Sequence, residues 1–165
     1  MIKYIAVFFI IASCSANSYS QTSGQESGSP SSDTKLFWLT AGLGAKVPTG
    51  LLAHVQLTYA WDVSSLSVNV AGTTAVKKTD DQVGLEGGLY YGRLSQSSNS
   101  MLRIAAGLGF LDLVRIHTTY LGVGGEAEAM VKLGPVGLGL MLSATVTPKY
   151  SYVGITANLE IGKLF

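Results

Sequence analysis

Apolar and polar residues alternate with a period of two along most of the chain after residue 35, as in β-strands whose two faces meet different surroundings. The pattern is clearest over residues 152–165, where odd positions are mostly apolar and even positions carry Tyr, Gly, Thr, Asn and Glu. Seven other segments behave alike: 37–47, 51–61, 66–76, 83–94, 102–116, 121–133 and 136–147. The pattern therefore predicts eight strands, each close to the roughly 9–11 residues that cross a bilayer when tilted.

The composition of the two faces indicates which one lies outside. One face is bulky and apolar, with Arg93, Asp112 and Lys163 as its charged exceptions, all toward strand ends. The other is dominated by glycine, serine and threonine, which suit a narrow barrel interior. We therefore predict an all-β fold over residues 36–165: a closed, eight-stranded, antiparallel, up-and-down transmembrane β-barrel. A soluble, ligand-binding barrel of the lipocalin kind, with a polar exterior, is the alternative from a different class.

Aromatic residues on the apolar face gather at one predicted rim. In an up-and-down barrel Phe37, Trp61, Tyr91 and Phe165 all fall at the same end, and Tyr59 lies two residues before Trp61. Such a belt is typical of the boundary between hydrocarbon and water. Because both ends of the barrel share this rim, we expect it to face the periplasm.

The first 20 residues have the features of an export signal. Lys3 precedes the apolar stretch 4–12, which is too short to span a membrane. Cleavage before Gln21 by ordinary signal peptidase is one interpretation. The other is a lipobox ending at Cys14, which would make this cysteine a lipidation site. The sequence favours neither.

Residues 21–35 form a stretch rich in serine and glycine that cannot bury enough apolar surface to fold, so we predict a disordered linker. In the whole chain only 13% of residues are charged, against about 25% in soluble domains. The net charge of +1 gives no field that would attract nucleic acid. A single cysteine excludes an intramolecular disulfide.

Charges on the polar face form the candidate site. Up-and-down strand order places Arg103, Lys132 and Glu160 in the inner half of the lumen and the others in the outer half. Because a buried charge needs a partner, we expect ion pairs that plug the lumen, with a narrow pore or an active site as alternatives. Glu126 and Glu128 come from one strand and Arg103 and Arg115 from the strand before it, so opposite charges can meet across this strand pair. The predicted charge network comprises Lys46, His54, Glu86, Arg103, Arg115, Glu126, Glu128, Lys132 and Glu160.

The alternating segment 152–165, with its terminal Phe165, looks like the C-terminal signal by which the barrel-assembly machinery recognises outer-membrane barrels. Residues 36–165 as a whole resemble the small eight-stranded barrels of the OmpA transmembrane-domain and OmpX kind. The resemblance implies an outer membrane of a Gram-negative-type cell, a periplasmic N-terminus and contact with outer-membrane lipid. Members of that family usually carry long outer loops, whereas those expected here are short, so adhesion is not the favoured role.

Some barrels of this kind are lipid A deacylases or palmitoyl transferases, which need a serine, a histidine and an acid near the outer rim. His54 has no obvious serine partner, and His117 lacks the His-x-Ser spacing of the deacylases. We therefore expect no catalysis, no cofactor and no metal. The predicted role is structural, envelope-stabilising or partner-binding, and a narrow channel is the runner-up.

Overall fold

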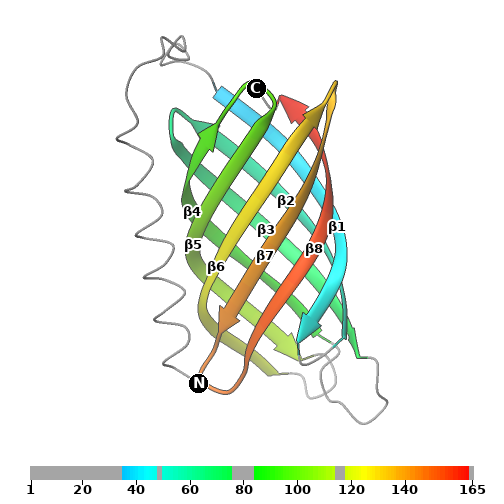
Figure 1. Cartoon of the computed structure of the whole chain (residues 1–165). Coiled ribbons are helices and arrows are strands. Elements are labelled where there is room, and N and C mark those ends of the chain that lie inside the picture. The colour runs from blue at the N-terminus through cyan, green and yellow to red at the C-terminus, as the bar shows by residue number, and fades with distance from the viewer. Residues whose placement is uncertain (1–34, 48–49, 76–83, 114–117, 164–165) are drawn as a thin grey trace. The chain divides into compact units, whose positions relative to one another are not determined.

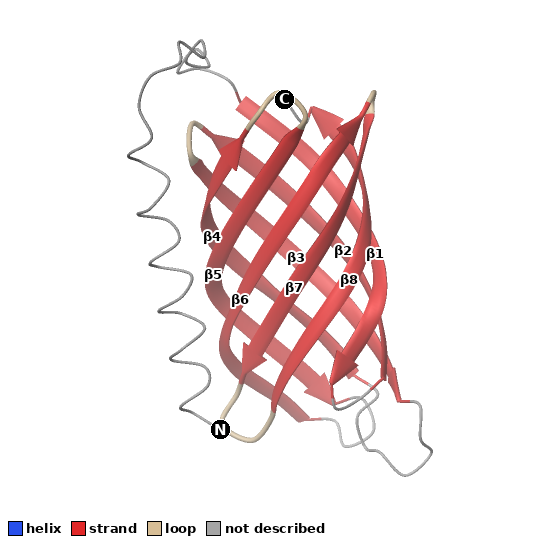
Figure 2. Cartoon of the chain, in the orientation of Figure 1, coloured by secondary structure: helices blue, strands red, loops and turns tan. Residues whose placement is uncertain are grey.

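A computed structural model describes residues 35–47, 50–75, 84–113 and 118–163, which lie within one compact unit of the chain, residues 33–165. Every regular element in this part is a strand, as Figure 2 shows. No helix among these residues is both long and apolar enough to cross a membrane. The strands are β1 (Lys35–Val47), β2 (Gly50–Trp61), β3 (Ser64–Ala75), β4 (Gly84–Gln96), β5 (Ser100–Leu113), β6 (Thr118–Leu133), β7 (Val136–Val146) and β8 (Ser151–Lys163).

The strands pair in sequence order, each antiparallel to the next, and β8 pairs with β1 to close the barrel (Figure 1). Paired residues followed from Leu36 through all eight strands lead back to β1 at Lys46, ten residues further along. For eight strands, that stagger corresponds to a strand tilt of about 40°. The closed antiparallel barrel predicted from the alternation is confirmed.

Side chains alternate between the two faces as the sequence pattern predicted. Outward-facing Leu43 and Leu121 are 71% and 76% exposed, whereas inward-facing Gln56 and Arg103 are fully buried. The barrel is therefore apolar on its outside and polar in much of its interior, the reverse of a water-soluble protein. This arrangement suits contact with hydrocarbon.

Strand boundaries differ slightly from those predicted. β1 begins at Lys35, so the last residue of the predicted linker belongs to the barrel. β3 keeps its alternation beyond Gly72, because Gly72 faces outward and Thr73 is buried inside. The pattern weakened there because a glycine and then a threonine, Thr74, stand at outward positions. β6 begins three residues earlier than predicted, at Thr118.

Candidate functional site

Arg103 of β5 forms the centre of the lumen, where its side chain is fully buried. Its Nε donates to Glu128 Oε2 at 2.9 Å, and its Nη2 donates to Glu126 Oε2 at 2.6 Å. Its Nη1 donates to the Ser67 hydroxyl at 3.0 Å, and Asn69 Nδ2 donates to the remaining oxygen of Glu126 at 2.5 Å. We call these five residues the Arg103 cluster. It joins β3, β5 and β6 through charge-assisted hydrogen bonds, the strongest kind available to side chains.

The strand register explains why this cluster forms. Arg103 and Glu128 are directly paired across β5 and β6, and Glu126 is paired with the small residue Ala105. The expected meeting of opposite charges across this strand pair is confirmed. The division into lumen halves does not separate Arg103 from Glu126, because Glu126 stands only two residues from the position paired with Arg103.

A second ion pair lies at the end of the lumen where β1 ends, away from the rim where β1 begins. Lys46 Nζ contacts the carboxylate of Glu86 from β4, and it donates to Thr73 Oγ1 at 3.3 Å. The same ammonium group lies 3.3 Å from the ring centroid of Tyr152, a favourable cation–π geometry. Lys46 and Glu86 therefore link four strands, β1, β3, β4 and β8.

Glu160 of β8 is fully buried, but neither carboxylate oxygen has a hydrogen-bond partner among the described residues. It occupies the space above Gly137 and Gly139 of β7, since a Cβ at either glycine would lie 2.8 Å or less from a Glu160 oxygen. The Glu160 carboxyl group lies near Glu128 and Arg103. Glu128 Oε1 also has no partner in this part of the chain. The lumen centre thus holds three carboxyl groups and one guanidinium.

His54 of β2 and Asn158 of β8 lie together above Gly42 of β1, each within 2.3 Å of where a glycine Cβ would stand. Both are buried, and neither ring nitrogen of His54 nor the amide of Asn158 has a partner in the described structure. The side chains of β1, β2 and β8 thus line the lumen with unpaired polar groups.

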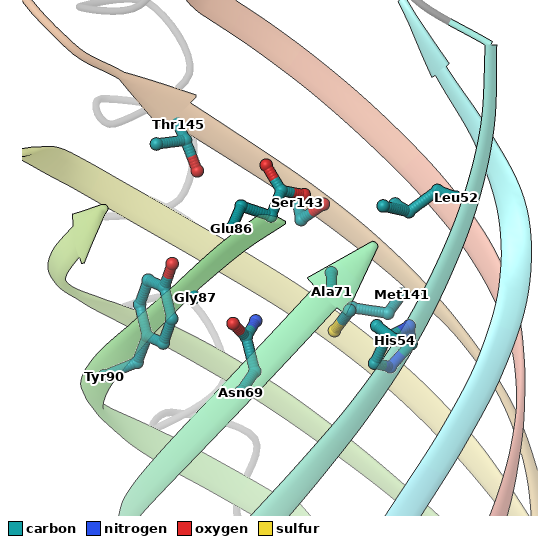
Figure 3. A pocket seen from close by; sticks show the side chains of 10 residues that line it. All are labelled: Leu52, His54, Asn69, Ala71, Glu86, Gly87, Tyr90, Met141, Ser143 and Thr145. Atoms are coloured by element: carbon teal, nitrogen blue, oxygen red, sulfur yellow. The ribbon is translucent and has the colours of Figure 1, made fainter. Parts of the chain in front are cut away.

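A small cavity lies between the Arg103 cluster and Lys46. Its volume is about 10 Å³, enough for roughly one water molecule and too small for a substrate. Ser143 and His54 both line it, but no hydrogen bond joins them, so the described residues hold no serine–histidine pair. Figure 3 shows the lining side chains: Leu52, His54, Asn69, Ala71, Glu86, Gly87, Tyr90, Met141, Ser143 and Thr145.

Apolar side chains fill the lumen toward its two ends, which sequence reasoning missed. At the end where β1 begins, Trp38 packs with Leu36, Ala60, Leu94, Met101 and Met130. Toward the other end, Leu111, Leu113 and Tyr152 form a second buried cluster, against which Tyr120 and Tyr150 pack. All residues of the first cluster stand at positions that the alternation assigns to the inward face. The alternation, and not the polarity of the side chains, was therefore the signal that could have identified them.

The aromatic residues predicted for the rim lie on the outward face at the end where β1 begins and β8 ends. Phe37, Tyr59, Trp61 and Tyr91 are each 38–56% exposed. The rings of Tyr59 and Trp61 lie 5.6 Å apart, and those of Trp61 and Tyr91 lie 6.3 Å apart. They form a continuous group across β2 and β4, which Ser64 of β3 joins through its hydroxyl, 3.1 Å from that of Tyr91.

Four other predicted residues stand apart from the central cluster. Lys132 lies on the inward face of β6 near the same rim and is partly exposed. Cys14, Arg115 and Phe165 lie outside the described residues. Within the described ranges no three histidine, cysteine or acidic residues are arranged to hold a metal ion.

No protein-family model matches this chain, and no curated protein matches it in sequence. Solved structures do. The N-terminal β-barrel domain of Pseudomonas aeruginosa OprF matches 79% of this chain and 98% of its own, with 10% identity and a TM-score of 0.64. Neisserial surface protein A matches 77% and 96% with 11% identity and a TM-score of 0.50. Ail, the attachment invasion locus protein of Yersinia pestis, matches 78% and 96% with 9% identity and a TM-score of 0.51.

These structures share one architecture with this chain, and the alignments cover almost all of each partner. The chain therefore has the fold of the small eight-stranded outer-membrane β-barrels. The resemblance to OmpA-like and OmpX-like barrels expected from the alternating strands is confirmed at the level of the fold.

Proposed function

We propose that this chain is an integral outer-membrane barrel with a periplasmic N-terminus, a closed lumen and no catalytic activity. Its role would be structural, envelope-stabilising or partner-binding. Two features support the membrane setting: the outward face is almost entirely aliphatic, and an aromatic group lies at one rim. The outward exceptions fit too, since Asp112 near one strand end accepts a hydrogen bond from Thr119 on the neighbouring strand.

The filling of the lumen carries the proposal of a closed barrel. From the end where β1 begins, the interior holds the Trp38 apolar cluster, then the Arg103 cluster, the Lys46–Glu86 pair and finally the Leu111 apolar cluster. Ion conduction would require moving Arg103 away from two buried carboxylates, and separating buried charges is costly. We expect little or no steady conductance for the wild-type barrel in planar bilayers.

A narrow channel is the second candidate, and the unpaired polar groups on β1, β2 and β8 favour it. The double variant Glu126→Ala with Glu128→Ala separates the two candidates, because it removes both acidic partners of Arg103. A closed barrel should become less stable, and should conduct more than the wild type if it still inserts. Large, reproducible single-channel steps from the wild type would instead support the channel.

The membrane setting can be tested with two adjacent residues on opposite faces. Leu140 is outward and 58% exposed at mid-strand, so Leu140→Lys places a charge in hydrocarbon and should block assembly. Met141 is buried in the lumen and paired in register with Glu128, so Met141→Lys introduces a cation beside an acidic excess and should be tolerated better.

The measurement is the gel mobility of boiled and unboiled samples, since membrane barrels keep their fold in cold detergent. A soluble, lipocalin-like barrel would tolerate Leu140→Lys and lose its fold with Met141→Lys. That reversed result would reject the membrane setting.

We also propose that the chain is exported by its first 20 residues and assembled through the segment ending at Phe165. If Cys14 is lipidated, Cys14→Ser abolishes fatty-acid labelling. If cleavage precedes Gln21, N-terminal sequencing of the mature protein begins at that residue, and Cys14→Ser changes nothing.

A further inference from the structure

The rim where β1 begins is unevenly charged on its outward face. Lys35 and Lys163 are diagonal neighbours there, because Lys163 is paired in register with Phe37, two residues from Lys35. Lys35 is itself paired with Trp61, which belongs to the aromatic group. Neither lysine forms an ion pair with any described residue, including Asp62 in the turn after β2. Outward positions at the same rim on β5, β6 and β7 are aliphatic, for example Leu102 and Leu133.

An apolar groove of about 780 Å³ crosses the outer wall on the same side of the barrel. This volume lies within the range of pockets that hold small molecules. The groove follows the row of paired residues Ala157, Leu43, Ala53 and Gly72, on β8, β1, β2 and β3, where three of the four side chains are small. A Cβ at Gly72 would meet no atom within 4 Å, so the groove is open at this position.

The groove approaches the lysines along β8. The end of the groove nearer the rim where β1 begins is lined by Leu138 and Leu159, which are paired across β7 and β8. Lys163 follows four residues after Leu159 on the same outward face, about 13 Å along the strand. An amphiphile whose anionic group rests on the lysines could therefore reach the groove with an acyl chain.

We propose that this wall binds a glycerophospholipid with an anionic headgroup. Its phosphate lies between Lys35 and Lys163, and one acyl chain lies in the groove. The two lysines, which form no ion pair with a described residue, supply the charge complementarity. Trp61 supplies an amphipathic ring at the headgroup level. The inference rests on the proposed membrane setting, but it adds a defined lipid site to what would otherwise be general contact with lipid.

The test uses the folded, full-length mature chain in vesicles containing equal amounts of phosphatidylglycerol and phosphatidylcholine. Native mass spectrometry then counts the lipids retained after extraction into detergent. The wild type should retain phosphatidylglycerol preferentially, and each lysine should contribute about fivefold to that preference. Lys35→Ala with Lys163→Ala should therefore lower it by roughly 25-fold. Gly72→Phe should lower retention of both lipids, because the new ring fills the groove.

Two control variants keep the test specific. Arg93→Ala removes a cation from the same rim on β4, away from the end of the groove that Leu138 and Leu159 line. Ala129→Phe adds the same ring on the outward face of β6, outside the groove. Both should leave retention unchanged. Equal retention of the two lipids by the wild type, or an equal effect of Arg93→Ala and the double lysine variant, would overturn the proposal.

Gel mobility of the same samples separates the two levels of failure. A chain that never acquires the heat-sensitive mobility of an inserted barrel contradicts the proposed membrane function. A chain that inserts but shows no lipid preference contradicts only the lipid site.

Discussion

The lumen has two walls that are equally buried but differ in how their polar groups are satisfied. On β3, β5 and β6, the Arg103 cluster joins one guanidinium, two carboxylates, an amide and a hydroxyl through four hydrogen bonds. On β1, β2 and β8, most buried polar side chains near the middle of the lumen carry an atom without a partner among the described residues. These atoms belong to Thr40, His54, Thr156, Asn158 and Glu160, and to the side-chain oxygen of Gln56.

The difference shows that burial alone does not fix a side chain's contribution. A charge-assisted hydrogen bond contributes roughly 1.5–3 kcal/mol, whereas a buried polar group without a partner costs about 1–3 kcal/mol. The paired wall should therefore stabilise the barrel, and the unpaired wall should tolerate or even benefit from replacement of its polar groups. Since buried polar groups are commonly satisfied by water, we expect the unpaired wall to be the hydrated one.

Removing the cation of the paired wall should produce the largest effect. Arg103→Met leaves Glu126 and Glu128 buried without a counter-charge, and breaking a buried pair in this way costs about 3–5 kcal/mol. We expect a loss of this size in the free energy of unfolding, measured by reversible urea unfolding in lipid vesicles, or complete failure to assemble. Arg103→Lys is the control: it keeps the charge but loses the forked geometry, so its loss should be smaller.

A loss below about 1 kcal/mol for Arg103→Met would show that the Arg103 cluster contributes little net stability. The two walls would then be equivalent in energy despite their different hydrogen bonding.

Two asparagines provide a matched comparison of the walls. Both Asn69 and Asn158 are buried and face the lumen, but only Asn69 donates to a carboxylate, that of Glu126. Asn69→Leu should therefore cost about 1.5–3 kcal/mol in the free energy of unfolding. Asn158→Leu removes an amide without partners and should change stability by less than about 1 kcal/mol. Equal losses in the two variants would mean that the walls do not differ.

Much of the fold could be predicted from the sequence, because a period of two assigns each side chain to a face regardless of which strands meet. The inward positions of Lys46, Glu86 and Glu160 followed from this rule alone. The meeting of Arg103 with Glu126 and Glu128 also followed, because the three residues stand on consecutive strands of one hairpin. Contacts between strands that are not neighbours, such as Lys46 with Glu86, could not be predicted because they depend on how the barrel closes. The inward position of Trp38 followed from the same rule. Its packing in an apolar cluster was missed, since a search for charges overlooks apolar residues that stand at inward positions.

The smallest expected effect concerns Glu160, the third carboxyl group near Arg103. Its oxygens have no hydrogen-bond partner, and Glu128 Oε1 beside it also lacks one. Glu160→Gln keeps the size of the side chain, removes an ionisable group from an acidic centre and adds an amide that can donate to Glu128. We expect the free energy of unfolding to rise by about 1 kcal/mol at neutral pH.

Acidification should reduce this difference, because a protonated Glu160 and a glutamine are both neutral groups that carry a donor. Urea unfolding of the wild type and the Glu160→Gln variant across a pH series measures the change. Glu128→Gln is the control from the paired wall, and it should lower stability because Arg103 loses a charged partner. If Glu160→Gln were as destabilising as Glu128→Gln, the Glu160 carboxyl group would have to be as well satisfied as those of the paired wall. The proposed difference between the two walls would then be wrong for Glu160.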